Sequence, residues 1–296
     1  MSGPASIAVA PAIERLWDEE FASPGERAIS AVLAEAYGGP LRVALRDDRP
    51  TVIVNFVSTL DGVVSFATPE AAGGGEVSGF FAPDQFVMGL LRALADVVLI
   101  GAGTLRGDPD GTWTPGAVFP GATTAFHELR ASLGLRPEPT TVVVSATGEL
   151  DLSHAGLADP SVPVRIFTTD RGRAALGRRG AAPHVSIEVL GNERVDPRRL
   201  IAALAGTGTG VVLCEGGPHL LGELLEADLA DELFLTVAPQ VAGRSPSVQR
   251  LSLIEGVAFD VASAPWWRVA SVRRAANHLF LRYRLDPDAA GHGGAS

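Results

Sequence analysis

The sequence predicts an α/β fold with a mostly parallel sheet and an antiparallel C-terminal edge. Short apolar runs, several of them rich in β-branched residues, alternate with segments of helical period along most of the chain. This is the pattern of units in which a helix connects two parallel strands. Near the C-terminus two apolar segments instead flank a polar turn at 274–277, which is typical of paired antiparallel strands. Neither a repeat nor a linker interrupts the alternation, so the pattern favours one continuous sheet.

The composition excludes several classes of protein. With 296 residues, 46% of them hydrophobic, the chain can bury a large core in one sizeable domain or two small ones. A formal net charge of −10 argues against nucleic acid as a partner, since proteins that bind it usually carry a basic face. Cys214 is the only cysteine, so neither a disulfide nor a thiolate metal cluster is expected. The acidic N-terminal stretch lacks the basic region of a signal peptide, and the apolar run near 97–100 is too short to cross a bilayer. We therefore expect a cytoplasmic protein.

Residues 1–50 are predicted to form an N-terminal helical extension. An amphipathic helical pattern covers 26–37 and is ended by Gly38-Gly39-Pro40. We expect this helix to pack on the main domain or on a partner subunit. The main domain is expected to span 51–285, and the glycine-rich tail at 286–296 is expected to be disordered.

The main domain begins with a predicted strand at 51–58, which is rich in β-branched residues and is closed by Thr59-Leu60-Asp61-Gly62. A short extended piece at 63–66 and a flexible glycine-rich stretch at 71–76 follow. An apolar stripe then predicts a helix at 83–95 that leads into a strand at 97–100. By the same patterns, further strands are expected at 141–145, 164–168, 185–190, 211–214, 232–238, 267–272 and 278–285, and further helices at 171–179, 197–204 and after Gly217.

Residues 211–226 combine a buried strand, a Gly-Gly turn and the start of a helix. Four consecutive apolar residues predict a parallel strand buried on both faces. Gly216 and Gly217 allow a tight turn and a close approach of the backbone to a ligand. Pro218 suits the first turn of a helix whose apolar face is rich in leucine. Because free N–H groups and the helix dipole point at such a turn, the stretch predicts a phosphate-binding site.

The common nucleotide-binding and catalytic motifs are absent from the sequence. Gly101-Ala102-Gly103 follows a strand, but the third glycine of a Rossmann G-x-G-x-x-G motif would fall on Arg106. The 211–226 stretch lacks the Gly-Lys-Ser/Thr of a P-loop. The chain also lacks a G-x-S-x-G elbow and an H-E-x-x-H motif, so we expect no metal site. His219, on the first helical turn, either contacts a ligand or faces solvent.

Three acids, Asp61, Asp108 and Glu215, lie just after the ends of predicted strands. In open α/β sheets ligands bind at this edge. Together the acids favour a polar substrate, although each one alone is also typical of a turn. Glu215 would repel a pyrophosphate, so we expect it to point toward the substrate. Arg92, within the helix at 83–95, is either a surface arginine whose stem covers apolar residues or a bidentate donor to a substrate phosphate.

Three segments together resemble a known family. They are STLDGVVS at 58–65, LLRALADVVLIGAGTLRGDP at 90–109 and LCEGGPHLLGELLEADLADELFLTVAPQVAG at 213–243. In this order and spacing they are similar to the bacterial pyrimidine reductases of riboflavin biosynthesis, the RibD C-terminal-like group. The resemblance implies a dihydrofolate-reductase-like, three-layer fold and a homodimer. It also implies an NADPH-dependent reduction of the ribosyl side chain of 5-amino-6-(5-phosphoribosylamino)uracil to ribityl.

The resemblance also implies roles for particular residues. The substrate would contact Asn55, Arg92, Asp108 and Glu215, with Arg92 at its phosphate. The NADPH contacts would come from Val57, Gly101, Gly103, Thr104, Asp108, Ser145, Gly216, Gly217, Pro218, His219, Leu220 and Leu221. Val57 and Asp61 would border the nicotinamide side, and Ser145 the adenosine side. Arg171 and Arg173 are candidates for the 2′-phosphate. Either Asp61 or Glu215 would steer or donate a proton, provided that burial raises its pKa.

Departures from the family pattern leave alternatives open. The zinc deaminase signature of the bifunctional members is absent, so we expect no deaminase activity. Some members carry a lysine where this chain has Asn55, and most have a basic residue where Gly111-Thr112-Trp113 stands here. One alternative is therefore a reductase of dihydrofolate or another pterin, with Asp61 as the ring-binding acid. The other is an NADPH-binding protein without catalysis.

Overall fold

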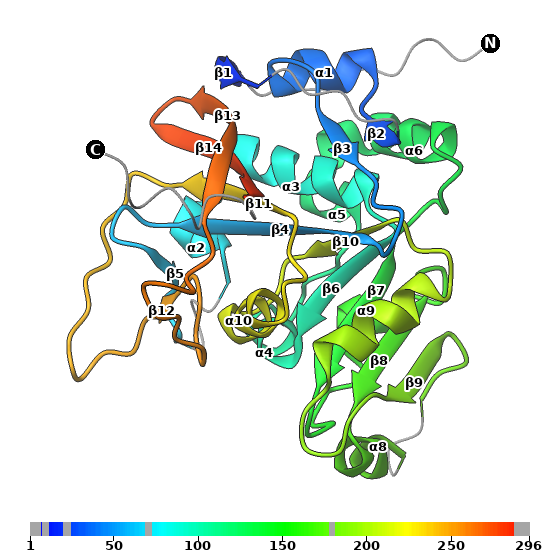
Figure 1. The fold of residues 1–296 in the computed structure, drawn as a ribbon. Helices are drawn as coiled ribbons and strands as arrows, with labels where there is room; N and C mark the ends of the chain where they lie inside the picture. Colours follow the sequence, from blue (N-terminus) through cyan, green and yellow to red (C-terminus); the bar gives the residue numbers. More distant parts are fainter. Residues whose placement is uncertain (1–6, 8–11, 20–24, 69–72, 178–180, 287–296) are drawn as a thin grey trace.

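A ten-stranded mixed sheet forms the centre of the protein, seen in a computed structural model that describes residues 7, 12–19, 25–68, 73–177 and 181–286 (Figure 1). In chain order its strands are β1 (Glu14–Asp18), β4 (Thr51–Ser58), β6 (Val97–Gly101), β7 (Thr140–Ser145), β8 (Val164–Thr168), β9 (Val185–Val189), β10 (Val211–Cys214), β11 (Glu232–Val237), β13 (Trp267–Ala275) and β14 (His278–Leu285). Across the sheet the order is β1-β13-β14-β11-β4-β10-β6-β7-β8-β9.

The strands from β11 to β9 in this order are all parallel. β4 lies between β10 and β11, and its residues Val52, Ile53 and Val54 are fully buried. Continuous apolar runs such as this form parallel strands because helices cover both faces of the sheet. The predicted α/β fold with a mostly parallel sheet is confirmed.

The other edge of the sheet is antiparallel, as predicted. β14 pairs with β11, and β13 pairs with β14. The outermost strand, β1, comes from the N-terminal 50 residues and pairs with β13. Its residues are mostly exposed and alternate in no clear pattern, so the sequence does not indicate a strand there. β1 is a strand because it pairs with β13, near the other end of the chain, and a local sequence pattern does not mark it.

The N-terminal region also contributes a small hairpin and a helix. β2 (Glu26–Ala28) pairs with β3 (Arg42–Ala44), and α1 (Ala31–Tyr37) lies between them in sequence. Helix α1 is shorter than the predicted helix because 26–28 are extended in β2. Gly38 ends α1 with φ of 76°, and Arg27 bonds Asp96 at 2.8 Å. This region is therefore packed on the main domain.

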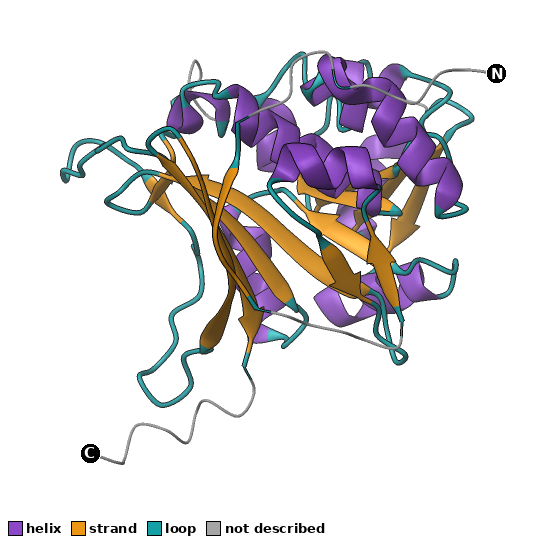
Figure 2. Ribbon diagram, turned by 90° about the horizontal axis from the view of Figure 1, so that it is seen from above, coloured by secondary structure: helices purple, strands orange, loops and turns teal. Residues whose placement is uncertain are grey.

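Helices cover both faces of the sheet (Figure 2). The helical elements are α2 (Gly75–Ser78), α3 (Ala82–Leu94), α4 (Ala102–Gly107), α5 (Pro115–Val118), η1 (Pro120–Ala122), α6 (Thr123–Ser132), α7 (Ala155–Ala158), α8 (Asp170–Gly177), α9 (Pro197–Ala205) and α10 (Pro218–Glu226). One apolar cluster packs α1, α3 and α6 on one face, and a second packs α9 and α10 on the other. The two short strands β5 (Val63–Ser65) and β12 (Leu251–Ser252) form a separate pair.

Residues 115–132 form helical elements that the sequence pattern does not predict. Arg130 interrupts the apolar face of α6, yet its side chain is 1% exposed. Its guanidinium donates to the carbonyl oxygens of Arg92, Ala93 and Ala95 at the end of α3. Free carbonyl groups at the end of α3 thus bind an arginine that lies on the buried face of α6. Because this buried residue is charged, the sequence of α6 does not show a clear amphipathic pattern.

Two predicted segments lie partly outside the residues that the structure describes. Residues 287–296 of the predicted tail lie outside the described residues, as do 69–72 of the glycine-rich stretch. Within the described part of the chain, none of the helices combines the length and the apolar character that a membrane span requires.

Candidate active site

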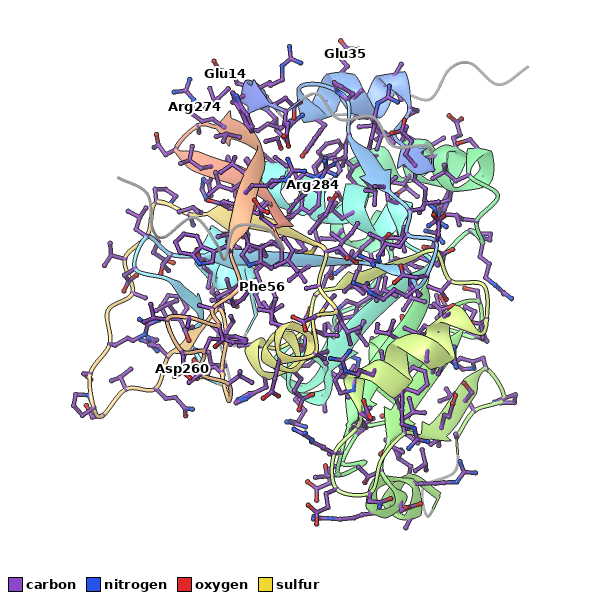
Figure 3. The ribbon with its side chains drawn as sticks, in the orientation of Figure 1. Glu14, Glu35, Phe56, Asp260, Arg274 and Arg284 are labelled. Carbon is purple, nitrogen blue, oxygen red and sulfur yellow. The ribbon has the colours of Figure 1, made fainter. Side chains whose placement is uncertain are left out.

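The carboxyl ends of the central parallel strands bring most of the predicted site residues to one edge of the sheet. Ile53 packs in the cluster beneath α3, whereas Val54 packs in the cluster beneath α10. Because side chains alternate along a strand, Asn55 and Val57 project to the α3 face. Phe56 lies on the α10 side of β4 (Figure 3).

Two glycine-containing turns lie side by side at this edge. An added Cβ on Gly216 would stand 2.5 Å from Ile100 Cα and 2.6 Å from Gly101 N. Gly217 has φ of 63°, and a Cβ there would stand 3.9 Å from Thr104 Oγ1. Residue 216 must be glycine, because the backbone atoms of Ile100 and Gly101 that a Cβ would meet cannot move aside. The turns that follow β6 and β10 therefore face each other across a short distance.

Each turn leads into a helix whose first N–H groups donate no hydrogen bond to a capping side chain. A Cβ on Gly101 or Gly103 would meet nothing within 4 Å, so a ligand can approach this backbone closely. Leu220 and Leu221 are buried in the core, and the N–H of Leu221 donates to the carbonyl oxygen of Gly217 at 3.1 Å. Oriented N–H groups at a helix start suit the pyrophosphate of a dinucleotide.

His219 and Pro218 differ in what they offer at this turn. His219 is exposed, and its Nδ1 would stand 2.9 Å from a Cβ added on Gly256. The imidazole therefore lies against the loop that contains Gly256. Pro218 is buried and has no N–H, so it shapes the start of α10.

Arg92 and Glu215 form a buried ion pair. Arg92 Nε donates to both carboxylate oxygens of Glu215 at 3.1 Å, and its Nη2 donates to Oε2 at 2.7 Å. Each side chain is 6% exposed. This forked geometry fixes the carboxylate at the end of β10 against helix α3.

The remaining N–H groups of Arg92 are also used. Nη1 donates to the carbonyl oxygens of Thr112 and Thr114 at 3.1 and 3.2 Å, and Nη2 contacts Met88 Sδ at 3.4 Å. A guanidinium has five N–H donors, and this arrangement occupies all of them. In this structure the N–H donors of Arg92 are therefore all engaged, and its contact with a substrate phosphate stays a prediction. It joins α3, the end of β10 and the segment around Thr112.

Asp61 is a hydrogen-bonded carboxylate in a turn. Its oxygens accept from Thr59 Oγ1 at 2.6 Å and from the backbone N–H groups of Ala242 and Gly243 at 3.0 and 2.7 Å. These donors hold the pKa of Asp61 well below its usual range. Asp61 is consequently ionised at neutral pH, so the condition for it to donate a proton, a pKa raised by burial, is not met.

The other predicted residues lie around this centre. A Cβ on Gly111 would stand 2.3 Å from Asp108 Oδ2, so the exposed carboxylate of Asp108 folds over the next turn. Ser145 is buried, and its Oγ accepts from the N–H of Gly148 at 3.1 Å. Val57 is buried in a small cluster with Val77 and Ala238. The hydroxyl of Ser145 therefore shapes the turn after β7.

The two arginine candidates for a 2′-phosphate are not equivalent. Arg173 Nη1 donates to the carbonyl oxygen of Ile187 at 3.0 Å, which ties it to β9. Arg171 is exposed in the first turn of α8, after the carboxyl end of β8.

One acid near the site was not identified from the sequence. Asp84, in the first turn of α3, is 7% exposed, and burial raises its pKa. Thr236 and Ser78 act to lower this pKa, and the charge of Glu215 acts to raise it further. Acids are common in the first turn of a helix because they interact favourably with the helix dipole. The type and place of Asp84 therefore do not mark it as a site residue, and its position two turns before Arg92 is the only signal in the sequence.

Comparisons with known proteins identify relatives of this arrangement. The family model described as the RibD C-terminal domain matches residues 50–280. A 2,5-diamino-6-ribosylamino-4(3H)-pyrimidinone 5′-phosphate reductase from Methanothermobacter thermautotrophicus is 28% identical, over 72% of this chain and 87% of the relative.

Solved structures share the fold at lower identity. A pyrimidine reductase-like protein from Corynebacterium diphtheriae has a TM-score of 0.63 at 20% identity, over 81% of this chain and 93% of that chain. A diaminohydroxyphosphoribosylaminopyrimidine deaminase/5-amino-6-(5-phosphoribosylamino)uracil reductase from Thermotoga maritima has a TM-score of 0.59 at 21% identity, over 80% of this chain and 57% of that chain.

Proposed function

Because this chain belongs to the RibD C-terminal domain family, we propose that it is an NADPH-dependent reductase of a ribosylaminopyrimidine phosphate in riboflavin biosynthesis. The substrate carries either an amino or an oxo group at ring position 2, as in the two named relatives. The observation that carries the proposal is the pair of facing glycine turns, with the Arg92–Glu215 pair beside them.

The turns after β6 and β10 fit the cofactor. Gly103 leaves open space, and the first turn of α4 and the residues after Pro218 in α10 provide N–H groups without side-chain caps. We assign the pyrophosphate to this backbone, with Thr104 beside it. Arg171 is our candidate for the 2′-phosphate because Arg173 is bonded to β9.

The cleft residues would orient the substrate. When bound, NADPH would supply a hydride to the sugar carbon next to the 6-amino nitrogen, and one proton taken up at the sugar ring oxygen completes the two-electron reduction to ribityl. Glu215, fixed by Arg92, would accept hydrogen bonds from the substrate, and Asn55 would offer an amide on the same face of the sheet. Asp61, as an ionised anchor of residues 242–243, would hold the loop that follows β11.

A direct assay tests this proposal. Purified protein is mixed with NADPH and, in separate reactions, with the 2-amino pyrimidine phosphate, the 2-oxo pyrimidine phosphate or dihydrofolate, and the loss of NADPH absorbance is followed. We expect turnover with at least one pyrimidine and not with dihydrofolate. Turnover of dihydrofolate alone would replace the proposal with the pterin alternative. Tight NADPH binding without any turnover would favour a non-catalytic protein.

We also propose that two copies associate through the antiparallel edge. β1 is the outermost strand and exposes Leu16 and Trp17, and Trp266 beside β13 is 60% exposed. Such apolar surface is usually covered in an assembly. Light scattering at micromolar concentration is expected to give a dimer mass, which Trp17→Lys lowers and the control Val261→Lys, in an exposed loop, leaves unchanged. A monomer mass for the unmodified chain would refute this.

A further inference from the structure

A separate cavity lies beside β11 at the end of that strand farther from the candidate active site. Its volume is about 830 Å³, which is in the range of pockets that hold small molecules. Arg284 lines this cavity and pairs in register with Glu232, the first residue of β11, whereas Val57 of the candidate site pairs with Thr236. Four residues of extended strand separate Glu232 from Thr236, a length of about 13 Å. The cavity and the candidate active site are therefore different places.

Arginine side chains dominate the lining of this cavity, which lies between residues of β1, β3, β13 and β14. Its charged lining residues are four arginines and two acids, namely Arg15, Arg42, Arg282, Arg284, Asp18 and Glu19. Both acids already bind arginines outside this lining, because Asp18 binds Arg273 at 2.8 Å and Glu19 binds Arg268 at 2.6 Å. The net charge of the whole chain is −10, so a cavity lined mainly by cations contrasts with the rest of the protein and favours an anionic ligand.

Arg282 offers one end of its guanidinium to the cavity. Its Nε and Nη2 donate to the buried carboxylate of Glu232 at 2.8 and 2.9 Å, and Nη2 also donates to the carbonyl oxygen of Arg42 at 2.6 Å. Among the described residues Nη1 has no hydrogen-bond partner, although it carries two N–H donors. The side chain is 8% exposed and lines the cavity. These two donors are therefore held at the surface of the cavity by the contacts that fix the rest of the guanidinium.

Arg15 supplies a second open guanidinium, from β1. Within the part of the chain that the structure describes, it forms no ion pair. A Cβ on Gly39 would stand 3.7 Å from Arg15 Nη1 and 3.5 Å from Arg273 Nη2, so these two guanidiniums lie close together. Arg273 is bound to Asp18, which leaves Arg15 as the member of this pair that can bind a ligand.

Like charges also lie close together at the β14 wall of the cavity. Burial lowers the pKa of Arg284; Glu232 acts to raise it, and the charges of Arg282 and Arg268 act to lower it. A single carboxylate, Glu232, accepts hydrogen bonds from both Arg282 and Arg284. A bound anion would stabilise these charged guanidiniums, and the guanidinium group is well suited to phosphate because its N–H donors match the phosphate oxygens.

We propose that this cavity binds a phosphate group, either as the free ion or on a small metabolite, through Arg282 Nη1 and the guanidinium of Arg15. A phosphate group has three acceptor oxygens arranged around phosphorus, so it can accept from donors on two different strands. The two oxygens of a carboxylate lie in one plane and suit a single guanidinium better. The volume of the cavity leaves room for an organic group beside the phosphate. This site is independent of the proposed reductase function.

Titration calorimetry of the full-length protein in a phosphate-free buffer tests this site. Inorganic phosphate, ribose 5-phosphate and succinate are titrated separately, and we expect the two phosphates to bind more tightly than the dicarboxylate. Arg15→Gln should weaken phosphate binding about tenfold, as expected for the loss of a charge-assisted hydrogen bond. The side chain of Arg15 is exposed, so this variant should keep the fold, which thermal unfolding checks.

Three further variants locate the binding. Arg282→Lys keeps a positive charge beside Glu232 but lacks the second end of the fork, so it should also weaken phosphate binding. Arg136→Gln, at an exposed arginine outside the cavity, is the matched control and should leave the affinity unchanged. Arg171→Gln, at the candidate 2′-phosphate site, reports whether ribose 5-phosphate binds in the cofactor site instead.

The outcomes identify the ligand or reject the site. Tighter binding of ribose 5-phosphate than of inorganic phosphate supports a phosphate monoester as the ligand, and equal binding supports the free ion. Absence of binding at millimolar concentration, an unchanged affinity in Arg15→Gln, a loss in Arg171→Gln alone, or equally tight binding of succinate would each overturn the proposal. Pyrimidine turnover without phosphate binding would reject this site and leave the reductase function intact, whereas phosphate binding without any turnover would do the reverse.

Discussion

Replacing Arg92 with methionine is expected to destabilise the protein far more than breaking a surface ion pair. Both Arg92 and Glu215 are 6% exposed, and the guanidinium makes three contacts of 3.1, 3.1 and 2.7 Å to the carboxylate. Removing one partner of such a pair leaves an uncompensated buried charge, which costs about 3–5 kcal/mol. Arg92→Met also frees the carbonyl oxygens of Thr112 and Thr114.

Glu215→Gln is expected to cost less. The amide oxygen can still accept from Arg92, and the carbonyl oxygens of Thr112 and Thr114 remain as acceptors for Nη1. The loss is then that of a charge-assisted hydrogen bond, about 1.5–3 kcal/mol. In Arg92→Met/Glu215→Gln the buried charge is gone, so the double variant should be more stable than the sum of the two single effects predicts, by about 1–3 kcal/mol.

Urea unfolding followed by tryptophan fluorescence measures these free energies. Trp113 is 4% exposed and lies beside the segment that Arg92 holds, so its emission reports on this region. Arg165→Met is the control, because its pair with Glu188 is 3.1 Å long but half exposed on the acid side and should cost at most about 1 kcal/mol. A loss in Arg92→Met no larger than in the control, or strictly additive single effects, would refute the reasoning.

Three further predictions concern the turns and the titratable groups of the site. Gly216→Ala should destabilise the protein by about 1–3 kcal/mol, because its Cβ would meet the backbone at Ile100; Gly103→Ala, whose Cβ meets open space, should keep the stability but weaken NADPH binding about tenfold in calorimetry. Unaltered NADPH affinity in the second variant would contradict the cofactor assignment. Asp61 has a lowered pKa, so its contribution to stability is present above the pKa of the unfolded chain and is lost as pH falls; the gap in urea midpoint between the unmodified protein and Asp61→Asn should shrink from pH 7 toward pH 3, and a constant gap would contradict this. Burial raises the pKa of Cys214 to about 12, so a thiol reagent should label it only after unfolding, and rapid labelling of the native protein would argue against that burial.

Much of the fold is encoded by local pattern. The run at 211–214 became β10, and Gly216, Gly217 and Pro218 became the turn and the helix start that the sequence predicts. Apolar period and the conformational freedom of glycine act over a few residues, so one sequence is enough to locate such elements. The parallel direction of the central strands also follows, because helices connect one strand to the next along the chain.

Contacts between residues far apart in the sequence could be identified only from the tertiary structure. Arg92 and Glu215 are 123 positions apart, and each alone was compatible with a substrate contact. Asp61 was one of two candidate proton donors, but the Thr59 hydroxyl and the N–H groups of Ala242 and Gly243 hold its pKa well below its usual range. β1 was hidden because an edge strand with exposed residues has no apolar alternation. For the Arg92–Glu215 pair and for β1 the deciding partner lies far away in the chain, and only folding brings the two together.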